Sequence, residues 1–162
     1  LIALGTVVFI VLSFEFLRFK ALAVNKWFFR NFGLLARETE TLRLTGASYM
    51  PIGGLAAFQV FQRDIAVLAV SFMAIGDAIA AIIGRWLGKK KFRGKTVEGI
   101  LACFVSCLVT GLVFYYAGLE ITLIMVLAGA AIATIVEAAS LPINDNLTMP
   151  LVTGLVINLV QF

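Results

Sequence analysis

The chain has 162 residues, of which 62% are hydrophobic and 14% are charged, and its formal net charge is +4. Soluble domains use only about 45–50% apolar residues, so this composition is typical of a protein that crosses a membrane several times. The sequence has no histidine, which excludes histidine-based zinc sites and Ser-His-Asp triads and leaves carboxylates as the metal ligands to expect.

Six apolar segments follow one another along the chain and are predicted to span the membrane, the shorter ones inside a bundle. They are Leu1–Phe19, Ala47–Phe61, Ile65–Ile83, Val97–Tyr116, Ile121–Leu141 and Met149–Gln161. We therefore expect an all-α integral membrane protein, a compact bundle of about six transmembrane helices that forms a single domain over residues 1–162. Because the chain begins at Leu1 inside an apolar run, we expect residues before it in the natural protein.

The segment Lys20–Leu44 separates the first two predicted spans and has an apolar face with basic residues around it. This pattern predicts an amphipathic helix that lies in the membrane interface. A loop that dips into the membrane and covers a site is the alternative.

Basic residues concentrate in two stretches, 18–43 and 85–95, and are rare in the turns on the other side of the predicted bundle. Cytoplasmic loops carry the excess of lysine and arginine, so both stretches are predicted to face the cytoplasm. Strict alternation of the spans then brings the segment Pro142–Thr148 to the same face.

Four charged residues, Glu15, Arg18, Asp77 and Glu137, lie within apolar segments, close to the predicted cytoplasmic ends. Each would cost about 2.5–3.5 kcal/mol at the centre of a membrane helix, so we expect a shared polar cavity at this end. Alternatives stay open for three of them: Glu15 and Arg18 are spaced to pair with each other, and Glu137 could only hydrogen-bond helix ends. Asp77 has no basic neighbour in its own turn, so its partner must be a basic loop or a cation.

The stretch Gly76–Gly99 combines an acid, a helix face of small residues and a basic loop. The small face allows another helix or a ligand to approach the backbone closely. Thr96 is placed to cap the next helix, and Glu98 in its first turn complements the helix dipole. A helix N-terminus beside Lys95 is also suited to bind phosphate. Downstream, Cys103 and Cys107 are predicted to be small buried residues.

These residues resemble the CTP-dependent lipid kinase family, which includes dolichol kinase, phytol kinase and the yeast-type diacylglycerol kinase. The central pattern is Asp-x-x-Ala-x-x-x-Gly-x-x-x-Gly, six residues, and Lys-Thr-x-Glu-Gly, which here runs from Asp77 to Gly99. Supporting matches are Glu15-x-x-Arg18, Arg37-Glu38-x-Glu40, and Asp145-Asn146-Leu147-Thr148-Met149-Pro150 after Glu137. Asn144 stands where family members often carry a second aspartate.

The resemblance implies a kinase that transfers the terminal phosphate of CTP to a membrane lipid alcohol at the cytoplasmic face, with Mg²⁺ or another divalent cation and without a nucleic-acid partner. It implies three groups of site residues: catalytic Asp77, Glu38 and Glu98; nucleotide-binding Lys95, Thr96, Arg93, Gly84, Gly88, Arg37 and Asn146; and metal-binding Asp77, Glu98 and Asp145. The lipid alcohol and the oligomeric state are left open.

Two other functions are compatible with the same sequence. A CDP-lipid synthase also joins CTP to a membrane lipid and carries a similar aspartate-glycine stretch, but it releases pyrophosphate where a kinase releases CDP. A membrane transporter without enzymatic activity would use the polar cavity for permeation.

Overall fold

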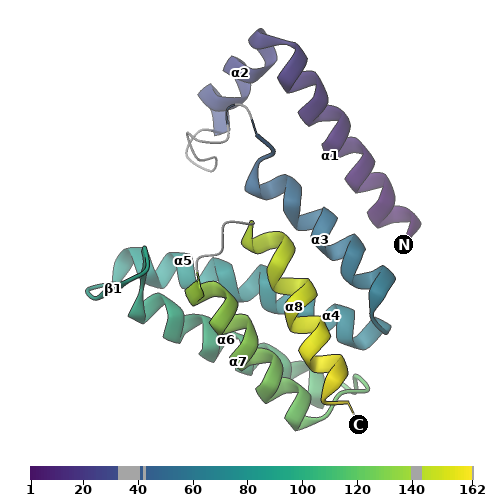
Figure 1. The fold of residues 1–162 in the computed structure, drawn as a ribbon, viewed down its shortest axis with the longest axis vertical. Coiled ribbons are helices and arrows are strands. Elements are labelled where there is room, and N and C mark those ends of the chain that lie inside the picture. The colour runs from purple at the N-terminus through teal and green to yellow at the C-terminus, as the bar shows by residue number, and fades with distance from the viewer. Residues whose placement is uncertain (33–40, 42, 140–143, 162) are drawn as a thin grey trace.

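The computed structural model describes residues 1–32, 41, 43–139 and 144–161. The protein is all-α apart from one short hairpin, as the sequence predicts (Figure 1). In chain order the elements are α1 (Ile2–Lys20), α2 (Leu22–Phe32), α3 (Gly46–Val60), α4 (Arg63–Ser71), the π-helical segment η2 (Phe72–Gly76), α5 (Asp77–Trp86), β1 (Lys91–Phe92), β2 (Lys95–Thr96), α6 (Val97–Tyr116), α7 (Leu123–Ala139) and α8 (Asp145–Leu159).

Each predicted span contains one helix, and α4, η2 and α5 together form a single continuous helix. In the described part of the chain, α1, the continuous helix Arg63–Trp86 and α6 are long and apolar enough to cross a membrane, and α7 is a shorter apolar helix of 17 residues. Helices α3 and α8 have 15 residues each and contain a proline. Membrane crossing by these two stays a prediction.

The outer face of α6 carries a continuous apolar stripe. Leu101, Val105, Val109 and Val113 recur every four residues, and all four are exposed. Exposed apolar surface of this extent is typical of a surface that contacts lipid. It supports the assignment of the chain as a helical membrane protein.

The core forms around η2, which packs against α4, α5, α6, α7 and α8. Phe72 and Met73 are completely buried there, and the Cys107 thiol donates a hydrogen bond to the Phe72 carbonyl at 3.7 Å. Both cysteines are free and buried, as predicted. A π-helical turn is rare and is often found at functional sites. Here it ends directly before Asp77.

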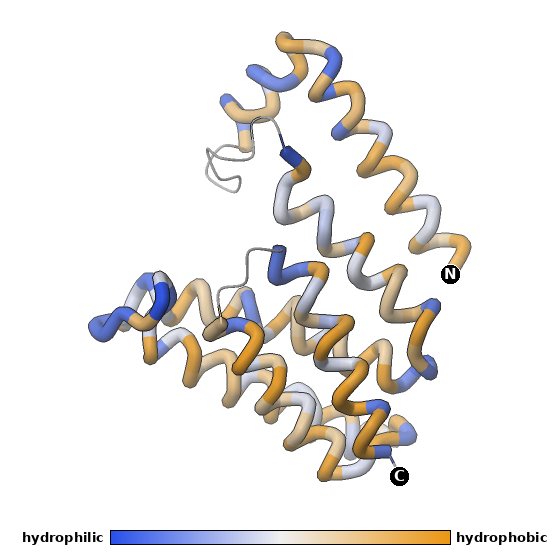
Figure 2. The backbone as a smooth tube through the Cα atoms, viewed as in Figure 1, coloured by the Kyte–Doolittle hydropathy of each residue, from blue (hydrophilic) through white to orange (hydrophobic). Residues whose placement is uncertain are grey.

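Polar residues gather at one end of the helices. The hairpin, α2 and the start of α8 lie toward the left of Figure 1, whereas the N-terminus, the α3–α4 turn, the α6–α7 connection and the C-terminus lie on the opposite side. Figure 2 shows hydrophilic segments at both ends and largely hydrophobic helices between them. This arrangement agrees with the predicted alternation of the spans.

A two-residue turn positions the hairpin that carries Lys95. Lys91 pairs with Thr96 and Phe92 pairs with Lys95, so only Arg93 and Gly94 lie in the turn. Their φ values are +49° and +87°, as a tight hairpin turn with two left-handed residues requires. The turn directs the chain back so that Lys95 lies directly before α6.

Candidate active site

The polar end of the protein contains a buried cluster of one lysine and two acids. Lys95 Nζ donates hydrogen bonds to Glu137 Oε1 at 2.7 Å and to Asp145 Oδ2 at 3.3 Å. The three residues come from β2, from the last turn of α7 and from the first residue of α8. We call Lys95, Glu137 and Asp145 the lysine–acid cluster. It joins three elements that are far apart in the sequence.

The second oxygen of Glu137 has no partner of its own. The side chain of Glu137 is only 3% exposed, and Oε2 is buried without a hydrogen-bond partner among the described residues. Asp77 and Asp145 both lie close enough for their negative charges to act on Glu137. Asp77 itself is half-buried, and its carboxylate forms no hydrogen bond or ion pair with another described residue. The site therefore holds more negative charge than Lys95 alone balances.

Lys95 is held in its charged form. Burial by itself would lower the pKa of this lysine, but the hydrogen bond and charge of Glu137, together with Asp145, outweigh burial and raise the pKa above its usual value. The side chain is 25% exposed, so the ammonium group keeps a path to solvent. It is thus a permanent positive charge that a ligand can reach.

The start of α8 is fixed by two asparagines. Asn144 caps the helix by accepting a hydrogen bond from the Asn146 backbone at 3.0 Å, and the Asn146 side chain donates to the Gly46 carbonyl at 2.8 Å. These contacts tie α8 to the start of α3 and position Asp145. The structure thus gives Asn146 a structural contact, whereas its predicted contact with nucleotide stays a prediction.

The small face of α5 packs against the start of α6. A Cβ atom on Gly84 would lie 2.7 Å from Thr96 Oγ1, and one on Gly99 would lie 2.8 Å from the Ala80 carbonyl. Thr96 also covers Gly88 and caps α6 by accepting from the Gly99 backbone at 3.2 Å, which confirms the predicted cap. The start of α6 therefore packs on this face, as one of the two predicted options has it. Contact of Gly84, Gly88 and Thr96 with nucleotide stays a prediction.

The predicted metal set of Asp77, Glu98 and Asp145 is not assembled in this structure. Among the described residues, no group of three or more Asp, Glu or Cys side chains lies close enough to hold a metal ion. The Glu98 carboxylate accepts a long hydrogen bond of 3.4 Å from the Lys90 backbone. It faces the basic loop because it lies in the first turn of α6, where the chain enters from the hairpin.

Two other predicted site residues, Arg37 and Glu38, lie outside the described residues. Arg93 is described and lies exposed in the hairpin turn, two residues before Lys95. The predicted contacts of Arg37 and Arg93 with nucleotide and the predicted catalytic role of Glu38 stay predictions.

A second polar cluster holds α1, α2 and α3 together. Glu15 and Arg18 pair with each other, with Arg18 Nε 2.8 Å from Glu15 Oε2, which confirms the pairing alternative. Glu15 Oε1 also accepts from the Ser48 hydroxyl at 2.6 Å and from the Thr45 backbone at 3.1 Å. The Arg18 guanidinium lies against aromatic rings, including that of Phe28, 5.5 Å away. This cluster is internally satisfied and serves packing.

Glu137 is the functional candidate that sequence reasoning left out of its site residues. It was one of the four charged residues in apolar segments, but nothing in the local sequence indicates its partner. Lys95 lies 42 positions earlier and reaches Glu137 only through the fold. Two signals point to Glu137: the free-energy cost of a carboxylate in a membrane helix, and its place before Asp145 in the family resemblance.

The fold and the site together define a class: a helical membrane protein with a lysine and several carboxylates at one end of its helices. The "Uncharacterized protein RP860" of Rickettsia prowazekii is 30% identical over 160 residues, and the match covers 93% of this chain and 78% of that protein. The chain belongs to the same family as this rickettsial protein. No protein-family model matches it, and no solved structure matches it.

Part of the chain is also similar to named enzymes. The "CTP-dependent diacylglycerol kinase 1" of Eremothecium gossypii is 30% identical over 65% of this chain, and its namesake in Saccharomyces cerevisiae is 30% identical over 56%. The matches cover 34% and 32% of those two proteins, so the chain spans about a third of their length. A continuous stretch of more than half of the chain has to include its centre, so the homologous region contains α5 and Asp77.

Proposed function

We propose that the protein is a lipid kinase that uses CTP. In the proposed reaction the hydroxyl oxygen of a membrane lipid alcohol forms a bond to the γ-phosphorus of CTP, and the bond from that phosphorus to the β,γ-bridging oxygen breaks. CDP leaves, the lipid becomes a phosphate monoester, and the hydroxyl proton passes to a carboxylate. The similarity to CTP-dependent diacylglycerol kinases supports this reaction class and makes a diacylglycerol the first acceptor to test.

The observation that carries the proposal is the position of the lysine–acid cluster. It lies at one end of apolar helices, beside an exposed basic hairpin and the half-buried Asp77. A triphosphate comes from water, whereas a lipid hydroxyl lies near the membrane surface, so the two can meet only at such an end. Phosphoryl transfer depends mainly on positioning and on charge neutralisation, which lysine and carboxylates provide.

The carboxylates present fit a divalent cation. Magnesium in phosphoryl-transfer sites is held by one or two carboxylates together with substrate phosphates and water. Glu137 and Asp145 already converge on one cation, and the buried Glu137 Oε2 has a free acceptor position among the described residues. We assign Glu137 and Asp145 to the cation, which would neutralise phosphate charge when bound, and Asp77 would act on the bound ion through its nearby negative charge.

The remaining residues have supporting roles in the proposal. Lys95 and Arg93 bind phosphates, and Arg37 assists them. Glu38 accepts the hydroxyl proton. Glu98, which touches the basic loop, contributes through its charge at the edge of the site.

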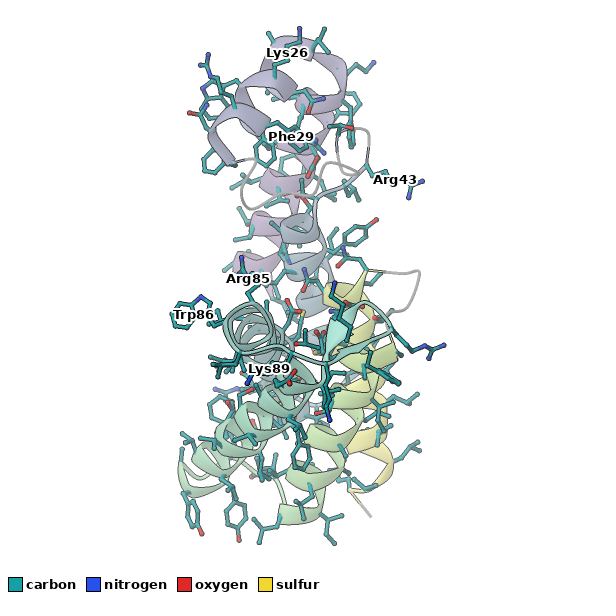
Figure 3. The ribbon with its side chains drawn as sticks, turned by 90° about the vertical axis from the view of Figure 1, so that its left-hand side faces the viewer. Lys26, Phe29, Arg43, Arg85, Trp86 and Lys89 are labelled. Atoms are coloured by element: carbon teal, nitrogen blue, oxygen red, sulfur yellow. The ribbon has the colours of Figure 1, made fainter. Side chains whose placement is uncertain are left out.

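We further propose that this end faces the cytoplasm. Lys26, Arg43, Arg85 and Lys89 all lie on the side of the molecule that faces the viewer in Figure 3, with Trp86 beside Arg85. Such an excess of cationic residues supports a cytoplasmic orientation.

In cells, a single cysteine at Lys26 or Lys90, in a background without Cys103 and Cys107, should resist an impermeant thiol reagent, and one at Ala117 should react. The reverse pattern would contradict the orientation.

The soluble product tests the reaction class. The purified chain in vesicles that contain diacylglycerol should convert CTP to CDP with Mg²⁺, and the amount of CDP should equal the amount of phosphorylated lipid. In parallel vesicles that contain phosphatidic acid, the acceptor that a CDP-lipid synthase needs, release of pyrophosphate would identify such a synthase. Turnover of neither kind, with folded protein and several lipid alcohols tested, would contradict the kinase proposal.

A further inference from the structure

The lysine–acid cluster contains a positive charge at the position where the acids could bind a metal ion. Lys95 Nζ lies between Glu137 Oε1 and Asp145 Oδ2, at 2.7 Å and 3.3 Å. Both acids therefore direct an oxygen at one point, and that point is occupied by an ammonium group. A cation of higher charge at the same point would meet both carboxylates with little rearrangement.

The Glu137 carboxylate has a second oxygen that can accept a further interaction besides its ion pair with Lys95. It is 3% exposed, and its Oε2 has no hydrogen-bond partner in the described part of the chain. Buried carboxylate oxygens normally have a partner, so Glu137 Oε2 is an acceptor that can take a further donor or a cation. A single lysine satisfies only Oε1.

The charges favour exchange of the lysine for a divalent ion. Glu137 and Asp145 share one ammonium group, and the nearby Asp77 carboxylate adds repulsion. A divalent ion, which prefers oxygen ligands, would balance this excess better than one ammonium group does. Lysine is suited to leave because its charge sits on a flexible four-carbon stem, and Lys95 is 25% exposed.

We propose that Lys95 occupies the divalent-cation position between Glu137 and Asp145 in the nucleotide-free protein, and that it moves to the nucleotide phosphates when the cation enters. The proposal deepens the proposed function and rests on it for the arrival of a metal–nucleotide pair. It makes Lys95 a competitor of the metal ion before nucleotide binds. The protein without nucleotide is then a weak metal binder by construction.

The test is metal binding without nucleotide or lipid substrate. Mn²⁺ is titrated into the full chain in phosphatidylcholine nanodiscs, and free Mn²⁺ is measured by electron paramagnetic resonance. Lys95→Met should bind Mn²⁺ about tenfold more tightly than the unmodified protein, or better, because a competing positive charge is gone. Lys95→Arg should stay weak. Lys90→Met, on the same basic loop, is the matched control and should not change the affinity.

The double variant Lys95→Met with Glu137→Gln tests whether the tighter Mn²⁺ binding of Lys95→Met involves Glu137. It should lose the tightening, because Glu137 no longer offers a charged oxygen. Equal or weaker Mn²⁺ binding by Lys95→Met than by the unmodified protein would overturn the proposal, and so would tight binding that survives Glu137→Gln. If Lys95→Met does not fold, Lys95→Gln replaces it, since the amide still donates hydrogen bonds to both acids but carries no charge.

A thermal shift gives an independent readout on the same samples. Mn²⁺ should raise the melting temperature of Lys95→Met more than that of the unmodified protein, as expected when an ion binds only the folded state. Neither measurement involves CTP turnover. Failure of the kinase reaction therefore leaves the exchange proposal standing, and failure of the exchange leaves the kinase reaction standing.

Discussion

Lys95 Nζ lies 2.7 Å from Glu137 Oε1, and this contact joins the basic hairpin to the end of a helix 42 residues later. The hairpin is thereby attached to the helices at the point where the acids lie close together. The contact gives Lys95 two functions, one in folding and one in charge balance at the site. Variants of Lys95 and Glu137 separate these two functions.

Removal of the lysine alone should destabilise the protein more than removal of the lysine together with the negative charge of its partner Glu137. Lys95→Met leaves the buried Glu137 without a cation, and we expect a loss of about 2 kcal/mol, less than the roughly 3–5 kcal/mol for fully buried pairs because Lys95 is partly exposed. Adding Glu137→Gln to Lys95→Met should recover part of this loss. Thermal unfolding in detergent measures both variants. An equal melting temperature for the single and the double variant would show that the pair does not contribute to stability.

Lys95 should also matter for nucleotide binding in a way that neighbouring lysines do not. Lys95→Met should raise the CTP concentration for half-maximal rate by about tenfold or more, because a buried, placed ammonium contributes more than an exposed one. Lys89 and Lys90 are exposed, and their joint change to methionine should have a much smaller effect. Equal effects of the two changes would indicate that bulk positive charge, and not a placed lysine, binds the phosphates.

Asp77→Asn should remove activity without unfolding the protein. The amide keeps the size of the side chain but loses the negative charge, so turnover should fall by about a hundredfold or more. The melting temperature should change little, because the Asp77 carboxylate forms no hydrogen bond or ion pair with a described residue. Glu120→Gln, at the exposed opposite end, is the matched control and should keep full activity. Near-normal turnover of Asp77→Asn at saturating Mg²⁺ would remove Asp77 from the site.

The close contact between α5 and α6 should require glycine at position 84. Gly84→Ala should destabilise the protein by about 1–3 kcal/mol, because the new Cβ would lie 2.7 Å from the capping Thr96 Oγ1. It should also lower activity, since Thr96 adjoins Lys95. Gly54→Ala is the matched control: its Cβ would meet nothing closer than 3.9 Å, so it should be neutral or slightly stabilising. If both variants melt alike, the close approach of the two helices is not required.

Much of the fold follows from the sequence because each element has a local signal. Runs of apolar residues give the six predicted spans, and Thr96 with its helix start gives the cap. The helix α8 begins at Asp145, four residues before the predicted Met149, because Asn144 supplies a cap that hydropathy alone does not register. The π-helical segment before Asp77 has no local sequence signal that we recognise.

The site was harder to predict because its contacts are distant in the chain. Asp77, Lys95 and Asp145 were found through their motif, but the partner of Lys95 depends on how α7 and α8 pack. The predicted metal acid Glu98 points to the Lys90 backbone instead, because the tight hairpin turn fixes where the chain enters α6. Glu137 takes the position beside Lys95 that sequence reasoning had not assigned.

The measurement that tests the central claim most directly follows labelled phosphate into lipid. The full chain in vesicles with diacylglycerol receives CTP labelled at the γ-phosphate or at the α-phosphate, in parallel, and Asp145→Asn serves as the impaired comparison. The account predicts that label from the γ-position alone enters the lipid, and that Asp145→Asn slows this transfer strongly. Lipid labelled from the α-position, or equal transfer by Asp145→Asn and the unmodified protein, would contradict it.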